Sequence, residues 1–414
     1  MTEPKKDFVP SPETAASRGS LFARLSLSYT AGGVAVPVAT VVLAFLIGGL
    51  VVLATGHNPL LAYRDIFDGA GLNWIFHPTT DTQGSIAAYN LTQTLLQSTT
   101  LIFTGLAVAF AFRCGMFNIG GEGQYIVGLV VANWIGVSFA GMSTLPHVLF
   151  AVLGATLAGA AWAGIAGVLK ATTGAHEVIS TIMLNWIAIY TATWLFGAGG
   201  PLQNNLPGQS TNPVSNDVVH SAQLPVFWGS QGFQGLDIGF FMAIGALVVF
   251  WALINRTTLG YEVRAVGFNP DAAAYGGINV KKNLIRAMAI SGAFAGMGGA
   301  VDMLGYLYHY GSLDVQNSAA GGVGFIGIAV ALLGRNTAVG VFLGSVLFGG
   351  LIYGTTQGLS SNVIQPELAS NVTLIIQGLV VLFIGADILI LYVWNSRKRL
   401  RRRPPAQAPA KAAA

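Results

Sequence analysis

Residues 91–140 decide the fold: LTQTLLQSTTLIFTGLAVAFAFRCGMFNIGGEGQYIVGLVVANWIGVSFA. Two apolar runs, 91–112 and 119–140, flank a short break in which one acid, Glu122, lies among glycines. Each run is long enough to cross about 30 Å of hydrocarbon as a helix. The stretch predicts two membrane-spanning helices joined by a tight turn. It also raises the question of why an acid lies where the chain re-enters the membrane.

The composition of the whole chain agrees with this interpretation. The 414 residues are 53% hydrophobic and 9% charged, with a mean hydropathy of +0.63, whereas soluble domains carry about 25% charge. The short alternating strands of a membrane β-barrel are not evident. The sequence predicts an all-α, polytopic membrane protein with about ten transmembrane helices, at 33–55, 91–112, 119–140, 146–169, 177–197, 237–255, 285–305, 320–334, 337–357 and 371–394.

The basic residues predict the orientation. If the N-terminus is cytoplasmic, 19 of the 20 Lys and Arg residues fall on the cytoplasmic side, and Arg64 alone falls outside. Such a bias is typical of the positive-inside rule. It predicts an even number of spans and two cytoplasmic termini. Segment 320–334 is short and Gly-rich, so it could be a full span or a re-entrant half-helix.

Three regions follow from these spans. Residues 1–31 form a polar cytoplasmic segment, residues 32–395 the transmembrane domain, and residues 396–414 a basic, Pro/Ala-rich cytoplasmic tail. A basic run directly after a transmembrane helix indicates an anchor on anionic membrane lipid rather than a nucleic-acid site.

Small residues predict close helix packing and a repeat. In lipid, a stripe of small side chains lets helix backbones approach, and such stripes are Ala151, Ala155, Gly159, Ala163 and Gly167, with the pairs Gly292/Gly296 and Gly340/Gly344. GGEG at 120–123 has an echo in GGVG at 321–324, and the two segments are predicted to run in opposite directions. This pattern favours an inverted repeat with Gly-rich broken or re-entrant segments.

The sequence lacks the common motifs for catalysis and for metal or nucleotide binding. The sequence has no GxxxxGK[ST] phosphate loop, no His/Cys/carboxylate cluster with metal spacing and no evident nucleophile–base pair. These absences argue against an enzyme and against a bound metal or nucleotide cofactor.

The cytoplasmic segment 256–286 contains a short predicted helix at 269–277. Asn269 is a good N-cap, Pro270 suits the first helical position, Asp271 complements the helix dipole, and Gly276 ends the helix. A two-turn helix is not stable alone in water. It therefore either lies on its own membrane domain or docks on a cytoplasmic partner.

Two groups of polar residues are candidates for a substrate pathway, because intramembrane polar side chains usually face the protein interior. The first is the stripe Glu177, Thr181 and Asn185, with Trp186 as a stacking face for a base. The alternative is that Glu177 only complements a helix start and Asn185 ties helices together.

The second group is Asn118, Glu122 and Gln124. Here Asn118 could cap the segment from 119 and Arg113 could pair with Glu122, so that a structural clamp is the alternative to substrate contact. Further expectations concern Asp302 and Asp387, with Arg286 or Arg335 as conceivable partners, and the aromatic run 306–310 as an interfacial anchor.

Four motifs resemble those of one family. The segment VGFNPDAAAYGGI is similar to the cytoplasmic coupling segment of ABC-importer permeases of the branched-chain amino acid/ribose/nucleoside superfamily. FRCGMFNIGGEGQ, AHEVISTIMLNWIA and GGVGFIGIAVALLGRN resemble signatures of its nucleoside branch, linked to basic membrane proteins. The Gln at 124 resembles the larger of the two paralogous permeases in such systems.

The resemblance implies the translocation subunit of an ATP-driven importer in a bacterial inner membrane. It implies a heterodimer with a shorter paralogous permease, an extracytoplasmic binding protein that delivers a nucleoside, and a separate cytoplasmic ATPase that binds the ATP. The residues that would couple to this ATPase are Asn269, Pro270, Asp271, Ala272, Tyr275 and Gly276. The alternatives are a pentose or branched-chain amino acid as cargo, a stand-alone secondary transporter, and a membrane scaffold.

Overall fold

A computed structural model describes residues 32–78, 81–204, 214–227, 235–305, 322–358, 371, 374–379 and 382. This part of the chain is mostly helical, with two isolated antiparallel bridges, Gln203–Ser215 and Val226–Asp237. The predicted all-α class is confirmed. The N-terminal segment 1–31, the aromatic run 306–310, Asp387, the tail 396–414 and most of the predicted span 371–394 lie outside the described residues.

The helices follow in chain order. They are α2 (Gly32–Ala54), α3 (Pro59–Gly69), α4 (Asn73–Phe76), α5 (Thr82–Arg113), α6 (Gly121–Ser138), α7 (Thr144–Thr173), α8 (Glu177–Phe196), the 3-10 helix η2 (His220–Ala222), α9 (Ile238–Arg256), α10 (Thr258–Phe268), α11 (Pro270–Tyr275), α12 (Val280–Leu304), α14 (Val323–Leu333) and α15 (Ala338–Gly358).

Seven helices of the described ranges are long and apolar enough to cross a membrane: α2, α5, α7, α8, α9, α12 and α15. They match seven predicted spans, and α6 matches an eighth although Glu122 and Gln124 make its first turns polar. Helix α14 has 11 residues and is therefore about 16 Å long at 1.5 Å per residue, about half of the hydrocarbon thickness. The segment 320–334 thus contains a half-helix and not a full span.

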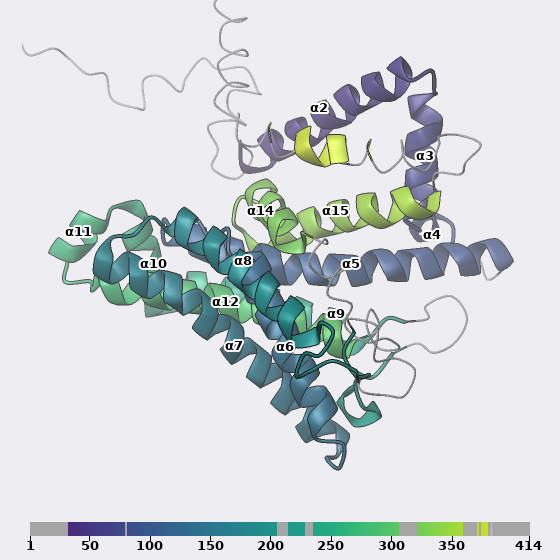
Figure 1. Ribbon diagram of the computed structural model, residues 1–414. Coiled ribbons are helices and arrows are strands. Elements are labelled where there is room, and N and C mark those ends of the chain that lie inside the picture. Colours follow the sequence, from purple (N-terminus) through teal and green to yellow (C-terminus); the bar gives the residue numbers. More distant parts are fainter. Residues whose placement is uncertain are drawn as a thin grey trace, which may run out of the picture.

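Helix α5 runs through the centre of the molecule, with α14 and α15 on one side and α6, α7 and α12 on the other (Figure 1). Its most apolar stretch is 83% buried, whereas the corresponding stretches of α2 and α8 are 22% buried. The buried hydroxyls of Thr92, Ser98 and Thr104 donate hydrogen bonds to carbonyls four residues earlier. Because these groups are satisfied within the helix, α5 can be buried without water.

The predicted small-residue stripe of α7 packs against α12. A Cβ added to Gly159 would lie 2.4 Å from the carbonyl oxygen of Gly292 and 2.8 Å from the Cα of Gly296. The same face of α12 is close to α6, because a Cβ on Gly128 would lie 2.5 Å from the Cα of Gly296. The predicted helix packing through small residues is therefore confirmed for these three helices.

The two Gly-rich echoes lie against each other. A Cβ on Gly324 would lie 2.1 Å from the backbone nitrogen of Glu122, and α6 and α14 both begin at this contact. From there α6 runs along α12 past Gly296, while α14 runs along α5 towards Arg113, which binds the carbonyl of Asn336. The two helices leave the contact in opposite directions, as expected for inverted segments.

The sequence-based prediction missed α3, α4, α10 and the 3-10 helix η2. Helix α3 packs on α15, where Gly69 is close to Gly358, and its charged residues Arg64 and Asp68 hid it from a search for apolar spans. Helix α10 precedes α11, which we had predicted to be isolated. Ala273 of α11 is buried, and α11 contacts both α10 and α12.

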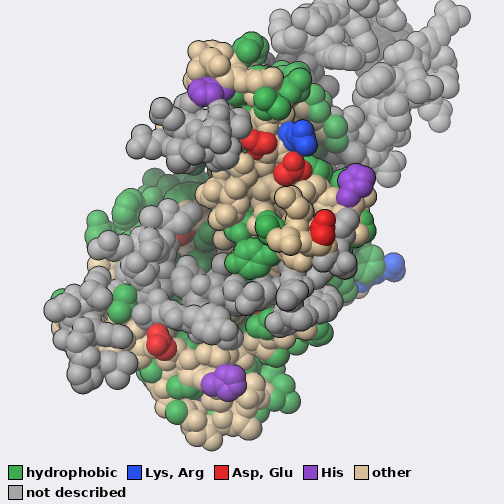
Figure 2. All heavy atoms as spheres, turned by 90° about the vertical axis from the view of Figure 1, so that its right-hand side faces the viewer, with side chains coloured by type: hydrophobic (Ala, Val, Ile, Leu, Met, Phe, Trp, Pro, Cys, Tyr) green, Lys and Arg blue, Asp and Glu red, His purple; other side chains and the backbone are tan. Residues whose placement is uncertain are grey.

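The face of the molecule on which α5 begins carries scattered acidic and histidine side chains and few basic ones (Figure 2). This distribution fits the side that the positive-inside rule places outside the cell. The orientation itself stays a prediction.

Candidate functional site

The turn between α5 and α6 folds around a buried amide pair. Asn118 donates from Nδ2 to Oε1 of Gln124 at 2.9 Å, and Gln124 donates from Nε2 to Oδ1 of Asn118 at 3.0 Å. The Asn118 amide also donates to the hydroxyl of Ser291 on α12 at 2.7 Å. Asn118 accepts from the backbone nitrogen of Gly120, so that it shapes the turn, but the N-cap of α6 is Gly120 and not Asn118 as predicted.

Asn185 ties α8 to this turn. Its Oδ1 accepts from the backbone nitrogen of Gly123 at 2.8 Å, and its Nδ2 donates to the carbonyl of Ile119 at 2.9 Å. The side chain is buried, and both halves of its amide are used. The contacts of Asn185 are those of the structural alternative, a tie between helices.

Glu122 crosses from α6 to α14. Its Oε2 accepts a hydrogen bond of 2.6 Å from the backbone nitrogen of Gly324, in the first turn of α14. The N-cap of α14 is Gly322, which has no side chain, so the carboxylate of Glu122 takes the place of a capping side chain. Its second oxygen, Oε1, is buried and has no hydrogen-bond partner.

Arg113 does not pair with Glu122, contrary to our expectation. Its guanidinium donates from Nε and Nη2 to the carbonyl of Asn336, at 3.0 and 2.7 Å. Asn336 follows α14 in a left-handed backbone conformation, with φ of 53°. The turn that ends α14 therefore holds this basic residue, and the carboxyl group of Glu122 lies at the start of α14 instead.

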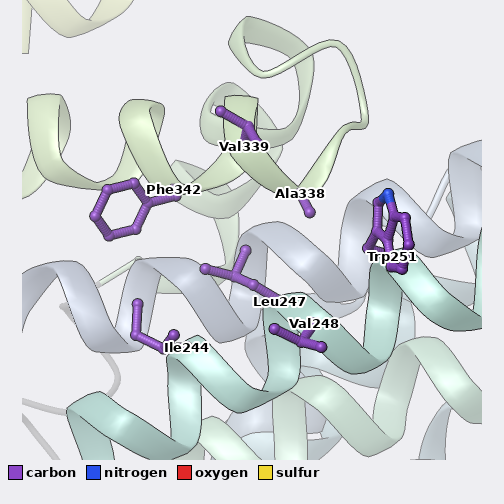
Figure 3. Close-up of a pocket in the computed structure, with 7 residues that line it drawn as sticks. All are labelled: Ile244, Leu247, Val248, Trp251, Ala338, Val339 and Phe342. Carbon is purple, nitrogen blue, oxygen red and sulfur yellow. The ribbon is translucent and has the colours of Figure 1, made fainter.

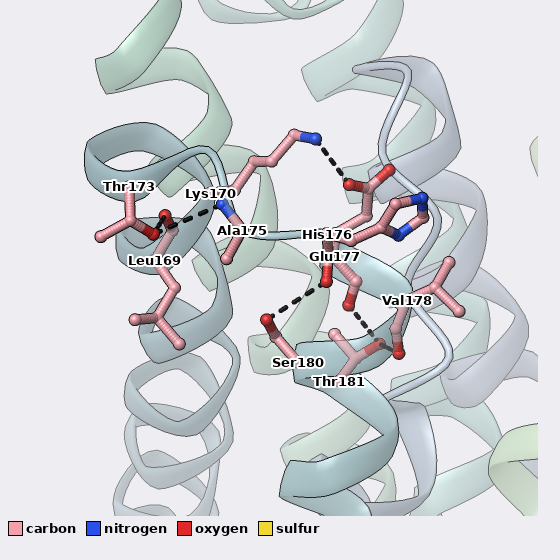
Figure 4. Close-up of polar contacts among 9 residues, drawn as sticks. All are labelled: Leu169, Lys170, Thr173, Ala175, His176, Glu177, Val178, Ser180 and Thr181. Atoms are coloured by element: carbon pink, nitrogen blue, oxygen red, sulfur yellow. Dashed lines mark hydrogen bonds and ion pairs between the residues drawn. The ribbon is translucent and has the colours of Figure 1, made fainter.

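Glu177 forms an ion pair with the end of the preceding helix. Its Oε2 lies 2.8 Å from Nζ of Lys170 on α7, and Figure 4 shows the two side chains reaching across the α7–α8 connection. Thr181 is buried and donates its hydroxyl to the carbonyl of Glu177 at 2.8 Å. The predicted polar stripe is real, but Glu177 and Thr181 make local contacts while Asn185 binds the α5–α6 turn, and none of the three lines the hollows described below.

Trp186 faces away from Asn185. It is 52% exposed on the outer surface of α8, where its ring stacks on Tyr190 with centroids 5.9 Å apart. These two rings, Trp194 and their neighbours line a hollow of about 490 Å³. The structure thus divides the first candidate group between the two faces of α8.

A second buried acid, Asp302, has partners that we had not predicted. It accepts hydrogen bonds from the hydroxyls of Thr100 on α5 and Tyr125 on α6, each at 2.7 Å. The expected partners Arg286 and Arg335 are not among these contacts. Tyr125 directly follows Gln124 in the stretch 91–140. Nothing in the sequence indicated that its hydroxyl would meet Asp302, or that α5, α6 and α12 would come together there.

The predicted coupling helix is built as expected at its start. Oδ1 of Asn269 accepts from the backbone nitrogens of Asp271 and Ala272, and Pro270 is the first helical residue. Gly276 follows the last helical residue. Tyr275 is 98% exposed, so α11 presents an aromatic side chain to its surroundings.

The segment 256–286 touches the α5–α6 turn through two glycines. A Cβ on Gly267 of α10 would lie 2.3 Å from the carbonyl oxygen of Arg113 and 2.9 Å from the nitrogen of Gly115. Next to this contact, burial raises the pKa of the Cys114 thiol to about 12. The contact connects α11 through α10 to the turn that carries Asn118.

Another hollow is a groove of about 310 Å³ between α9 and α15. Figure 3 shows Leu247, Val248 and Trp251 of α9 facing Phe342 of α15 across it. Its lining is apolar, which suits a lipid chain better than a polar solute. Within the described residues, no group of three or more His, Cys, Asp or Glu side chains is arranged to hold a metal ion.

Comparisons with known proteins identify the family to which this chain belongs. Residues 90–385 match the model of the family described as branched-chain amino acid transport system / permease component. The chain is 38% identical to the guanosine ABC transporter permease protein NupP of Bacillus subtilis, over 88% of this chain and 96% of NupP. It is 35% identical to the nucleoside ABC transporter permease protein NupB of Lactococcus lactis, over 89% of this chain and 95% of NupB.

A third relative is the glucose ABC transporter permease protein TsgB13 of Haloferax volcanii, 32% identical over 84% of this chain and 86% of TsgB13. The second permeases of the two bacteria, NupQ and NupC, are 28% and 29% identical over 64% and 62% of this chain. No solved structure matches. The family model covers most of the chain, from residue 90 within α5 to beyond α15, and this multi-pass membrane protein therefore belongs to the branched-chain amino acid transport system / permease component family.

Proposed function

We propose that this chain is the membrane-spanning translocation subunit of an ATP-driven importer for nucleosides. The observation that carries the proposal is the likeness to NupP and NupB, permeases for guanosine and nucleosides, over nearly the full length of all three chains. A permease subunit is not itself an enzyme, and ATP would be bound and hydrolysed by a partner chain.

The partners follow from the same comparison. B. subtilis and L. lactis each have a second permease related to this chain, and the chain is more similar to NupP and NupB than to NupQ and NupC. We infer a heterodimer in which this chain takes the place of NupP or NupB. An extracytoplasmic binding protein would deliver the nucleoside.

Helix α11 is the proposed dock for the ATPase, through Asn269, Pro270, Asp271, Ala272, Tyr275 and Gly276. Tyr275, the last residue of α11, and Phe268, the last residue of α10, are 98% and 95% exposed. Large apolar side chains that exposed are typical of a surface that a partner covers. A stand-alone secondary transporter would have no use for such a surface, and this distinguishes it from an importer subunit.

The proposed location is the bacterial inner membrane, with both termini in the cytoplasm. The ends of α5, α7 and α9 carry Arg113, Lys170 and Arg256. With these ends on the cytoplasmic side, the positive-inside rule is obeyed.

Sugar is the second candidate cargo, because TsgB13 is a glucose permease. A pentose or a branched-chain amino acid is the further alternative within the same class of importer. All three give the same fold and the same proposed dock, and only transport measurements separate them.

Uptake of radiolabelled guanosine tests the proposal. A strain without its own nucleoside uptake would express the chain together with the second permease, the ATPase and the binding protein encoded beside it. We expect ATP-dependent uptake that excess unlabelled nucleosides abolish and excess glucose, ribose or leucine do not. An ATPase partner with an inactive nucleotide site is the control and should abolish uptake. Uptake driven by an ion gradient without the ATPase would overturn the assignment as an ATP-driven importer. Competition by a sugar but not by nucleosides would overturn the nucleoside as cargo.

A further inference from the structure

Helix α8 carries an aromatic ladder on its outer face. Trp186, Tyr190 and Trp194 follow each other at every fourth residue, so they lie on one side of the helix. They are 52%, 66% and 66% exposed, and the rings of Trp186 and Tyr190 are stacked with an interplanar angle of 27°. Met183, Ile187 and Thr191 complete the hollow of about 490 Å³ around them.

The depth of this ladder does not suit a lipid-facing surface. Aromatic belts lie at the membrane–water interfaces, but Trp186 is the tenth residue of α8, about 14 Å from its start. There its indole N–H would face hydrocarbon without a hydrogen-bond acceptor. Leaving such groups unsatisfied in lipid is costly.

A lipid-facing surface of the same protein looks different. The groove between α9 and α15 is lined by aliphatic side chains and Phe342, with Trp251 as its polar-tipped member. Trp251 is the fourteenth of the 19 residues of α9, about 8 Å from its end, and the guanidinium of Arg256 is 5.2 Å from its ring. An indole this close to the end of a span fits the interfacial belt, whereas one in the middle of a span does not.

The inner face of α8 leaves little for a substrate to bind. The amide of Asn185 is used by Gly123 and Ile119, and the amides of Asn118 and Gln124 are used by each other. A solute that bound here would have to break buried hydrogen bonds. The outer face offers flat rings and free polar tips without that cost.

We propose that the outer face of α8 forms a wall of the translocation pathway and that Trp186 and Tyr190 stack on the base of the transported nucleoside. The inference rests on the proposed nucleoside importer and specifies its substrate contacts. An aromatic ring can stack on either face of a nucleobase. The indole N–H and the phenol hydroxyl are donors that point along the ring planes, so they can serve ribose oxygens beside the stacked base. The second permease would close this face against lipid.

Cysteine labelling tests whether the ladder faces water or lipid. The native Cys114 is buried and needs no replacement, so the unmodified transporter is the blank. Trp186→Cys and Tyr190→Cys, in the assembled transporter in membrane vesicles, would be treated with a charged thiol reagent that reacts only in contact with water. We expect both to be labelled, and guanosine to slow labelling at least about fivefold. Val248→Cys, from the groove of Figure 3, is the matched lipid-facing control and should stay unlabelled.

Uptake kinetics give a second measurement. Trp186→Leu should raise the KM for guanosine at least about tenfold, as expected for the loss of one stacked base. Trp186→Phe keeps a ring and should raise it much less, and Trp251→Leu should leave it unchanged.

The outcomes separate the two proposals. If the unmodified transporter takes up guanosine but Trp186→Cys and Tyr190→Cys stay unlabelled, or Trp186→Leu keeps the KM, the α8 wall is wrong and the importer stands. If the unmodified transporter takes up no nucleoside, the proposed function fails and the stacking role fails with it.

Discussion

Buried polar side chains connect the α5–α6 turn and the start of α6 to backbone groups of distant segments. Asn185 binds Gly123 and Ile119, and Glu122 binds Gly324. Helix termini in a membrane leave backbone groups that need partners. These side chains supply the partners where the chain breaks, which answers why an acid lies at the re-entry point.

Replacing Asn185 tests this role. Asn185→Leu leaves the N–H of Gly123 and the carbonyl of Ile119 without their partner, each at a cost of about 1–3 kcal/mol. We expect a lower melting temperature of the detergent-purified protein, followed by tryptophan fluorescence, and weaker uptake, with protein still present in the membrane. Ile179→Leu, exposed near the start of the same helix and outside the hollow that Trp186 lines, is the control. An unchanged melting temperature together with wild-type uptake would contradict both the tie and any pathway role.

Replacing Glu122 separates its shape from its charge. Glu122→Gln can still accept from Gly324 through its amide oxygen, so we expect nearly wild-type stability. Glu122→Ala leaves that N–H unsatisfied and a cavity beside it, and should lower the free energy of unfolding by about 1–3 kcal/mol. Denaturation in mixed micelles measures both variants. Equal loss in the two would mean that the negative charge, and not the hydrogen bond, is what α14 requires.

At the scale of single residues, the sequence predicted which polar side chains are buried but not what they bind. The stripe of Glu177, Thr181 and Asn185 is visible in the spacing. The partners of Asn185 and Glu122 are 62 and 202 residues away. They depend on how helices pack, which local patterns do not encode.

Helices α6, α7 and α12 owe their close packing to glycine, and the positions differ sharply in the room they offer. Gly159→Ala would place a Cβ 2.4 Å from the carbonyl of Gly292, whereas Gly164→Ala in the same helix meets nothing within 4 Å. We expect Gly159→Ala to cost about 1–3 kcal/mol and Gly164→Ala to change stability little. Melting temperatures of the two purified variants make the comparison, and equal values would refute the packing role of Gly159.

The docking role of α11 can be tested by charge and bulk. Asp271→Arg with Tyr275→Arg changes two side chains at the surface without touching the buried Ala273. If the ATPase docks here, the double variant should fail to co-purify with it and should lose uptake at least tenfold, because a docking patch does not tolerate two misplaced charges. The control is Tyr89→Arg, an exposed aromatic residue near the start of α5, far from the end of α5 that contacts α10. If the double variant still co-purifies with the ATPase and still takes up guanosine, α11 is not the docking site.

Among the elements, the long apolar helices were predictable and the short polar ones were not. Hydropathy located α7, α8, α9 and α15 to within a few residues. It missed α3 and α10, whose sequences mix apolar and charged residues. It also could not decide whether the segment 320–334 crosses the membrane. Only the 11-residue length of α14 decides that.

The orientation of the whole molecule is open to a direct test. Tyr275→Cys on α11 and Ser143→Cys in the α6–α7 turn are both exposed and should lie on opposite sides of the membrane. From the bias in Lys and Arg we expect an impermeant thiol reagent to label Ser143→Cys in intact cells and Tyr275→Cys only in inverted vesicles. The opposite pattern would invert the topology, and labelling of both from one side would mean that the number of crossings between them is wrong.

For the molecule as a whole, composition was enough for the fold class and motifs were enough for the family. The arrangement of the helices around α5 was not predictable, because all outer helices are similarly apolar. Two observations depend on that arrangement: the meeting of GGEG with GGVG, and the separation of Asn185 from Trp186 on α8.

The contact between Gly115 and Gly267 has a mechanical consequence. Most neighbouring helices touch through side chains, which can rotate and absorb part of a displacement. Here backbone meets backbone, because a Cβ on Gly267 would lie 2.3 Å from the carbonyl oxygen of Arg113. If α11 is the dock, we expect a displacement of α11 and α10 to reach the turn that holds Asn118 through this contact, with no side chain between to absorb it.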